Sequence, residues 1–487
     1  MSLISLIGYT LVGVLLYAVL SVVFPPLNFP HNIPTIPFYV SFLGTYTKMD
    51  QRDIYERYLR TKLEKYGAVK IYFANRWNIL VVKPEYLNQM FKEEDVFAKS
   101  GNHKKIPHAV LSHYTGDNVI SAHGATWKTY RSIIQKSVQF PERSHVYINT
   151  KKFVSIIDDA IEDGDPKICE RALPVSDFLQ RLSLANISQS MLGVDFGTLD
   201  SPNSELHRRL KIVKSHIFKP IYMNFPVLDQ LPIKSRILAR EEVHNFRKFY
   251  AEKVIEAQKD STKELNEDSA AYQLYKSLQR GDITEKQFID NLVIILVAGH
   301  ENPQLFFTSL LYILAKYPEV QSRLYRELQA TDYEDLDNAP YLASVIFETL
   351  RFFPPLGQII NRCASRNAVL GGDIHVPKGT YLGYNNYATT HSSAWTNSDS
   401  FIPERWGSDL DEVMKNYKRA KSNATLPSFH GGKRACLGER FALFESKMFL
   451  KGVLEKFEIK MDETWVEKLT PAGPICPLML RVVFKRR

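Results

Sequence analysis

A glycine-rich loop ahead of an amphipathic stretch constrains this chain more than any other feature. The loop reads Phe429-His-Gly-Gly-Lys-Arg-Ala-Cys436-Leu-Gly438, and the amphipathic stretch covers Arg440 to Phe457. Glycine lets a backbone approach a flat cofactor, and the first amide groups of the following helix would point toward Cys436. Both features favour a thiolate. The loop therefore predicts a cysteine sulfur presented to a planar cofactor.

The spacing F-x-x-G-x-R-x-C-x-G resembles the haem-binding loop of the cytochrome P450 family. A lone cysteine is usually a small buried hydrophobe, and a zinc ligand or thiol nucleophile would need partners that the local sequence lacks. The resemblance implies haem b with Cys436 as the metal ligand, Phe429 against the haem face, Arg434 on a propionate and Gly438 in the tight turn. A thiolate donates electron density to iron and favours O–O cleavage.

An E-x-x-R pair precedes this loop, as it does in the family. Glu348 and Arg351 share one helix face, and the segment Phe401-Ile-Pro-Glu-Arg405-Trp406 supplies Arg405 as a third member. In isolation such a pair is usually a solvated surface ion pair. Buried charges persist only when they are paired and hydrogen-bonded, so we expect a structural triad that supports the haem loop.

Three further residues are expected at the haem propionates. Trp127 and Arg131 lie one helical turn apart in a W-x-x-x-R pattern, and Arg362 follows the E-x-x-R segment. In the family these positions reach the propionates, and an indole N–H with two guanidinium groups suits two carboxylates. The alternative is an ordinary amphipathic helix.

A long apolar segment predicts a buried central helix. It starts at a capping box formed by Thr284 and Gln287 and continues to about Lys316. Its uninterrupted apolar run is too short to span a bilayer. At its middle the family has an acid followed by threonine, and here the segment reads Ala298-Gly-His-Glu-Asn-Pro303.

Gly299, Glu301 and Asn302 are the candidate catalytic residues of this helix. We expect Gly299 to admit haem or oxygen, Glu301 to deliver protons, and Asn302 to hydrogen-bond to bound oxygen. Pro303 removes a ladder hydrogen bond and is expected to distort the helix. Asparagine is a poor proton donor, so its place where the family has threonine weakens the case for ordinary hydroxylation.

The first 47 residues contain no Asp, Glu, Lys or Arg. The apolar segment 3–24 would rise roughly 33 Å as a helix, enough for a hydrocarbon core of about 30 Å. The alternatives are a cleaved secretory signal and a helix buried in a groove, but the basic flank and cleavage site of a signal are missing. We therefore expect a retained anchor at 1–24, a proline-rich connector at 25–47 and one catalytic domain at 48–487.

The body is expected to be mainly α-helical with a small β-rich subdomain, the cytochrome P450 fold preceded by a transmembrane helix. The net charge of +9 fits an anionic membrane surface or an acidic protein partner, and no nucleic-acid motif is present. The four cysteines form no CxxC pair, which argues against a zinc module or a disulfide scaffold and fits a reducing compartment.

Several long stretches resemble a fungal sporulation branch of the family that forms dityrosine for the spore wall. They include Phe97-Ala-Lys-Ser-Gly-Asn102, Tyr114-Thr-Gly-Asp-Asn-Val-Ile-Ser121 and Ala298-Gly-His-Glu-Asn-Pro-Gln304. The resemblance implies an N-formyl tyrosine substrate and oxidative coupling of two phenol rings to N,N′-bisformyl dityrosine. A substrate carboxylate would need a nearby cation, for which Lys104 and Lys105 are candidates, although such a cluster is more often a solvated loop.

The resemblance also implies NADPH electrons delivered by a cytochrome P450 reductase. Lys128, Lys433 and Arg440 flank the haem elements and predict a basic docking face. The expected location is the endoplasmic reticulum membrane, with a single span and the catalytic domain in the cytosol. A hydroxylating monooxygenase acting on another small aromatic or lipophilic molecule is an alternative function, and a haem-binding sensor without turnover is another.

Overall fold

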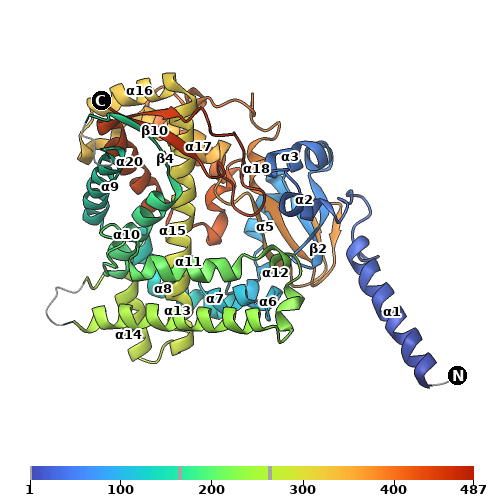
Figure 1. The fold of residues 1–487 in the computed structure, drawn as a ribbon. Helices are drawn as coiled ribbons and strands as arrows, with labels where there is room; N and C mark the ends of the chain where they lie inside the picture. The colour runs from blue at the N-terminus through green and yellow to red at the C-terminus, as the bar shows by residue number, and fades with distance from the viewer. Residues whose placement is uncertain (1–2, 163–166, 261–265) are drawn as a thin grey trace.

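The computed structural model describes residues 3–162, 167–260 and 266–487, most of them in helices (Figure 1). The helices of the first half are α1 Leu3–Val23, α2 Val40–Tyr46, α3 Gln51–Ile54, α4 Arg60–Tyr66, α5 Pro84–Lys92, α6 Asn102–Lys105, α7 Val110–Thr115, α8 Gly124–Gln139, α9 Ser144–Glu162 and α10 Ser176–Leu192. Those of the second half are α11 Glu205–Ile217, α12 Pro220–Asn224, α13 Lys234–Lys259, α14 Ala270–Gln279, α15 Glu285–Lys316, α16 Pro318–Gln329, α17 Pro340–Phe352, α18 Asn386–Thr390, α19 Leu410–Ser422 and α20 Glu439–Lys456. A π turn covers Tyr55–Leu59, and short 3-10 turns cover Pro226–Gln230, Tyr333–Asn338, Pro403–Trp406, Pro427–Phe429 and Gly432–Arg434.

The strands form three separate small sheets. Their bounds are β1 Ala68–Phe73, β2 Arg76–Val81, β3 Phe97–Lys99, β4 Glu170–Pro174, β5 Gln358–Ala364, β6 Ala368–Leu370, β7 Ile374–Val376, β8 Tyr381–Asn385, β9 Phe457–Met461 and β10 Arg481–Arg486. The largest sheet has the order β1-β2-β8-β5-β3, the second β4-β10-β9, and the third pairs β6 with β7. Only β2 and β8 pair in parallel among the named strands.

A break in register between β5 and β8 lies next to the site described below. The pairing shifts between Ile359 and Arg362, so Ile360 and Asn361 fall outside the regular ladder. Opposite them, a Cβ on Gly383 would lie only 1.9 Å from the Ile359 carbonyl oxygen, so no other residue fits there. Such bulges redirect side chains and leave backbone groups unpaired.

Helix α1 projects away from the body (Figure 1). Its residues Ser5–Val23 have a mean hydropathy of 2.3 and none of them is buried, which makes this helix a candidate membrane span. The Trp77 indole N–H donates to the Ser21 carbonyl at 3.1 Å and holds the end of α1 against β2. An apolar helix without charges and without protein cover fits a hydrocarbon environment.

The proline-rich segment after α1 packs against the body over much of its length. Phe29, Ile33 and Ile36 are buried. The amide of Ile36 donates to the Lys70 carbonyl at 2.9 Å, and the amide of Lys70 donates to the Pro34 carbonyl at 2.8 Å. This part of the segment 25–47 therefore extends the edge of β1, and the domain boundary at residue 48 stays a prediction.

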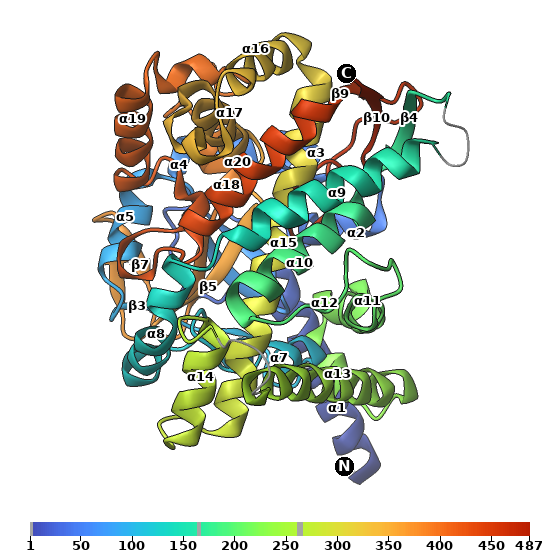
Figure 2. The same ribbon diagram turned by 90° about the vertical axis from the view of Figure 1, so that its left-hand side faces the viewer.

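Helix α15 passes through the middle of the molecule, and α20 and α9 run side by side across it (Figure 2). The predicted capping box starts it, because Thr284 accepts from the Gln287 amide and Gln287 accepts from the Thr284 amide. The helix continues through Pro303 without interruption to Lys316, and the expected distortion at this proline stays a prediction. Pro303 still has no N–H to donate to the carbonyl of Gly299.

Candidate active site

The loop before α20 presents the Cys436 side chain to an internal cavity. The Cys436 amide donates to the Phe429 carbonyl at 2.9 Å, which closes the loop on itself. Gly432 has a φ of +62°, and a Cβ there would lie 2.7 Å from the Phe91 carbonyl oxygen. Glycine is therefore required, because both the backbone conformation and the contact with α5 exclude a side chain.

The electrostatics at Cys436 differ in part from the expectation. Burial raises the pKa of the thiol to about 11, although hydrogen bonds from the Gly438 and Glu439 amides lower it. These amides alone do not make the sulfur a thiolate near neutral pH. A metal cation stabilises the deprotonated form of a coordinating thiol, so this sulfur with its amide donors fits an iron ligand.

The cavity lies between α15 and the cysteine loop and has a mainly apolar lining. The residues of α15 that line it include Ile294, Ile295, Ala298, Gly299, Asn302, Pro303 and Phe306. Phe429, Gly438 and Phe441 line it from the loop and α20. An apolar wall with few polar groups is typical of a site for a flat cofactor and an aromatic substrate.

The packing of α10 gives a second reason for glycine at position 299, and the expected access of haem or oxygen stays a prediction. A Cβ at this position would lie 2.2 Å from the Cδ1 atom of Ile187 on α10. The space that glycine leaves is thus filled by the neighbouring helix, and close packing of α10 on α15 requires it. Gly299 still borders the cavity through its backbone.

The two polar candidates of α15 point to different places. Glu301 pairs with Lys214 of α11 at 3.0 Å, and it is not among the residues that line the cavity. Asn302 does line the cavity, and its amide donates to the Ala298 carbonyl at 3.4 Å. His300, the residue before Glu301, is completely buried and donates to the Leu296 carbonyl at 2.7 Å, and burial holds its pKa well below the usual range.

Cationic side chains gather at one end of the cavity. Trp127, Arg131 and Arg434 line it, and the Arg434 guanidinium lies 4.4 Å from the Trp127 ring centre. Arg434 pairs with Glu94 at 2.7 Å and donates to the Ala122 carbonyl at 2.8 Å. Sequence reasoning missed Glu94, which no motif marks.

Arg362 is the clearest sign that an anion belongs at this end. Its side chain is 1% exposed and donates to the Phe97 carbonyl at 2.8 Å, but its Nε and Nη2 atoms are buried without a partner. Burial lowers its pKa, as expected for a cation without a counter-ion. Unpaired guanidinium donors beside Arg131 and Arg434 fit the two propionates of a haem.

Lys99 is a further cation at the same end that the sequence analysis did not single out. It is 3% exposed, lines the cavity, and donates to Asn361 Oδ1 at 3.2 Å and His430 Nε2 at 2.9 Å. The other ring nitrogen of His430, Nδ1, shares a hydrogen bond with the Tyr384 oxygen at 2.6 Å. These hydrogen bonds connect strands β3, β5 and β8 to the cysteine loop.

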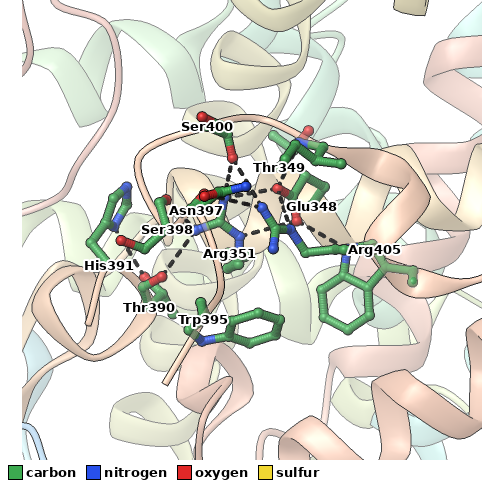
Figure 3. Close-up of polar contacts among 12 residues, drawn as sticks. Glu348, Thr349, Arg351, Thr390, His391, Trp395, Asn397, Ser398, Ser400 and Arg405 are labelled. Carbon is green, nitrogen blue, oxygen red and sulfur yellow. Dashed lines mark hydrogen bonds and ion pairs between the residues drawn. The ribbon is translucent and has the colours of Figure 1, made fainter. Parts of the chain in front are cut away.

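The three members of the expected triad, Glu348, Arg351 and Arg405, lie in contact with one another (Figure 3). Glu348 and Arg351 are fully buried and 2.8 Å apart, and Arg405 Nε donates to the same Glu348 oxygen at 2.9 Å. The Trp406 indole donates to the other oxygen at 3.1 Å, and Arg351 also donates to the Ser398 carbonyl at 2.7 Å. A fully partnered buried carboxylate can fix the approach to the loop without taking part in chemistry.

The structure does not bring Lys104 and Lys105 to the cavity. Lys104 is exposed, and Lys105 is buried against strands β5 and β8. Neither is among the residues that line the cavity. Their contact with substrate stays a prediction.

The chain is similar in sequence to known cytochrome P450 proteins. The cytochrome P450 family model matches residues 33–480. The chain is 46% identical to Cytochrome P450-DIT2 of Saccharomyces cerevisiae over 99% of both chains. It is 36% identical to Cytochrome P450 monooxygenase xanG of Aspergillus fumigatus, over 91% of this chain and 85% of that one.

The chain belongs to the cytochrome P450 family and is an oxidoreductase enzyme with a haem-thiolate centre. A crystal structure of the cytochrome P450DA heme domain agrees in fold, with a TM-score of 0.75 and 18% identity over 94% of this chain and 99% of that one. The predicted fold class and enzyme class are thereby confirmed. The individual residue roles stay predictions.

Proposed function

We propose that this enzyme couples two N-formyl tyrosine molecules to N,N′-bisformyl dityrosine for the spore wall. The observation that carries the proposal is the 46% identity with Cytochrome P450-DIT2 across 99% of both chains. The stretches that resemble the dityrosine-forming branch agree with it, and they include the Ala298–Gln304 segment beside the cavity.

Cys436 would hold the iron, and Phe429 would pack against the haem. The haem propionates would lie against Trp127, Arg131, Arg362, Arg434 and Lys99. When bound, a thiolate-ligated haem activates oxygen and takes hydrogen atoms or electrons from the substrate. The surrounding chain would exclude water and hold the phenols near the iron.

Coupling requires removal of one hydrogen atom from each phenol and formation of one C–C bond between the rings. Molecular oxygen takes these two hydrogens together with two electrons from NADPH and two protons, and leaves as two waters. The apolar walls around Ile294, Ala298 and Phe306 suit two aromatic rings, and the amides of Asn302 and Asn361 offer polar contacts. Asn302 supplies a weak donor where ordinary hydroxylation uses a hydroxyl group.

Electrons would come from NADPH through a cytochrome P450 reductase. The exposed Lys433 and Arg440 beside the cysteine loop offer basic groups to an acidic partner. Helix α1 would anchor the enzyme in the endoplasmic reticulum membrane with the catalytic domain in the cytosol. Weaker reduction at higher salt would support electrostatic docking, and a salt-independent rate would exclude it.

The test is incubation of the purified enzyme with reductase, NADPH and N-formyl tyrosine, followed by mass spectrometry. Coupling predicts a dimer lighter than two substrates by two hydrogens, absent in Cys436→Ala. A substrate-sized product heavier by one oxygen would instead identify a hydroxylating monooxygenase. The similarity to a relative named as a monooxygenase keeps that second function open.

A further inference from the structure

Lys105 is a buried lysine without a carboxylate partner. Its side chain is 3% exposed, and its ammonium donates to the Ile360 carbonyl at 3.3 Å. The same ammonium lies 5.1 Å from the Phe73 ring centre and 5.3 Å from that of Tyr381. Among the described residues, no acid forms an ion pair with it. Lysine is almost never fully buried unless it is paired, so this position needs an explanation.

Arg76 brings a second cation to the same place. Its guanidinium lies 4.7 Å from the Tyr381 ring centre and donates to the Lys105 carbonyl. Its Nε atom is buried without a partner, and no described carboxylate pairs with it. Burial, and then the charge of Arg76, lower the pKa of Lys105 to about 7. Arg76 and Lys105 thus lie against one tyrosine ring, and no described carboxylate forms an ion pair with either of them.

The cluster lies directly behind the wall of the cavity. The register break in β5 removes Ile360 from the ladder, and its carbonyl accepts from Lys105 instead. Its neighbours Ile359 and Asn361 line the cavity. On the other side, Phe73 is 42% exposed, so one ring of the cluster reaches the molecular surface.

We propose that Arg76 and Lys105 bind the carboxylate of an N-acylated aromatic amino acid beside the part of the cavity wall that Ile359 and Asn361 form. The inference rests on the proposed function and extends it by naming the group that selects the substrate. The cavity is mainly apolar, so the phenol ring can enter while the charged end stays beside the two cations. A guanidinium fork and an ammonium together match the two oxygens of a carboxylate.

Ligand binding without turnover tests this inference. The two probes are N-formyl tyrosine and N-formyl tyramine, which differ only in the carboxylate, and the readout is the change in the haem absorption spectrum on titration. We expect Lys105→Met and Arg76→Met each to weaken N-formyl tyrosine binding about tenfold, because a charge-assisted hydrogen bond is lost. Binding of N-formyl tyramine should not change.

Lys65→Met is the control, since Lys65 has an exposed side chain and does not line the cavity. Lys105→Arg keeps the charge and should keep the preference for the acid. If Lys105→Met fails to fold, Arg76→Met decides the matter, because Arg76 is only partly buried. Equal weakening of both ligands, or of neither, would show that the two cations only stabilise the fold.

The result of this binding test and the result of the coupling assay can be distinguished from each other. An enzyme that prefers the acid through Arg76 and Lys105 but gives no dimer would overturn the coupling function and leave this subsite in place. An enzyme that makes the dimer equally well after both substitutions would overturn the subsite and leave the coupling function in place.

Discussion

Lys214 of α11 lies 3.0 Å from Glu301 of the central helix α15. The two side chains are 22% and 24% exposed, so the pair is partly shielded from water. It joins α11 to the part of α15 that borders the cavity, while Asn302, the next residue, faces inward. Glu301 is therefore held beside the cavity by a partner that it would have to leave in order to deliver a proton.

Substitutions at this pair should separate proton delivery from structural support. Glu301→Gln removes the carboxylate of the pair, which is the group expected to deliver protons, and should slow product formation by about tenfold or more. Lys214→Met leaves the carboxylate and frees it, so product formation should be retained. The measurement is dimer formed per NADPH consumed. A Glu301→Gln enzyme with full rate and full yield would exclude Glu301 from proton delivery.

Glu348→Gln should destabilise the enzyme strongly. The substitution leaves Arg351 buried without its charge partner, at a cost of about 3–5 kcal/mol in the free energy of unfolding. Glu404→Gln is the matched control, because Glu404 is 53% exposed in a surface pair with Arg323 and such pairs contribute about 1 kcal/mol or less. Thermal unfolding measures the stability of both variants, and the carbon monoxide spectrum shows whether their haem-thiolate centre is intact. Similar losses in the two variants would contradict a structural triad.

Arg362→Met should weaken haem retention. Two of its guanidinium nitrogens are buried without a protein partner, and we propose that a propionate accepts from them. Loss of such a charged hydrogen bond should speed haem transfer to an acceptor such as apomyoglobin about tenfold. Arg366→Met, exposed and four residues away, should transfer haem at the wild-type rate. Equal rates in all three proteins would remove Arg362 from the propionate site.

Glu445 predicts a specific dependence of stability on pH. It lines the cavity and is 1% exposed, and one oxygen accepts from Asn186 at 3.2 Å while the other has no partner. Burial raises its pKa from 4.5 to about 8. Between these values the folded state binds more protons than the unfolded state, so this group's contribution to stability falls as pH rises and levels off above about 8.

Glu445→Gln should therefore gain stability over the wild type as pH rises through that window. The slope of the difference is at most about 1.4 kcal/mol per pH unit. The comparison is the unfolding midpoint of both proteins from acidic to slightly alkaline pH, with the exposed Glu463→Gln as control. A pH-independent difference between Glu445→Gln and wild type would mean that Glu445 is ionised in the fold.

Local spacing was enough to predict several elements of this structure. The capping box at Thr284, the E-x-x-R pair at Glu348 and the loop around Cys436 each depend on residues within a few positions of one another, and helix geometry or glycine conformation fixes their relation. The apolar segment before Pro25 predicted α1 in the same way, because an apolar stretch of this length without charges is typical of a membrane-spanning helix.

Contacts between distant segments were not predictable from the sequence. Lys99 and Asn361 are 262 residues apart, and neither position carries a periodic pattern that would reveal the other. The close contact between Gly299 and Ile187 was not predictable either, because Ile187 lies on another helix whose position the sequence does not give. The partial burial of the proline-rich segment likewise depends on an edge of β1 that only the folded sheet provides.

The central claim is that two phenols are joined without insertion of oxygen. The most direct measurement supplies the enzyme, reductase, NADPH and N-formyl tyrosine with oxygen gas enriched in the heavy isotope, and follows the label by mass spectrometry. The account predicts an unlabelled dimer lighter than two substrates by two hydrogens, with the heavy oxygen released as water. A product that carries the heavy oxygen would contradict it.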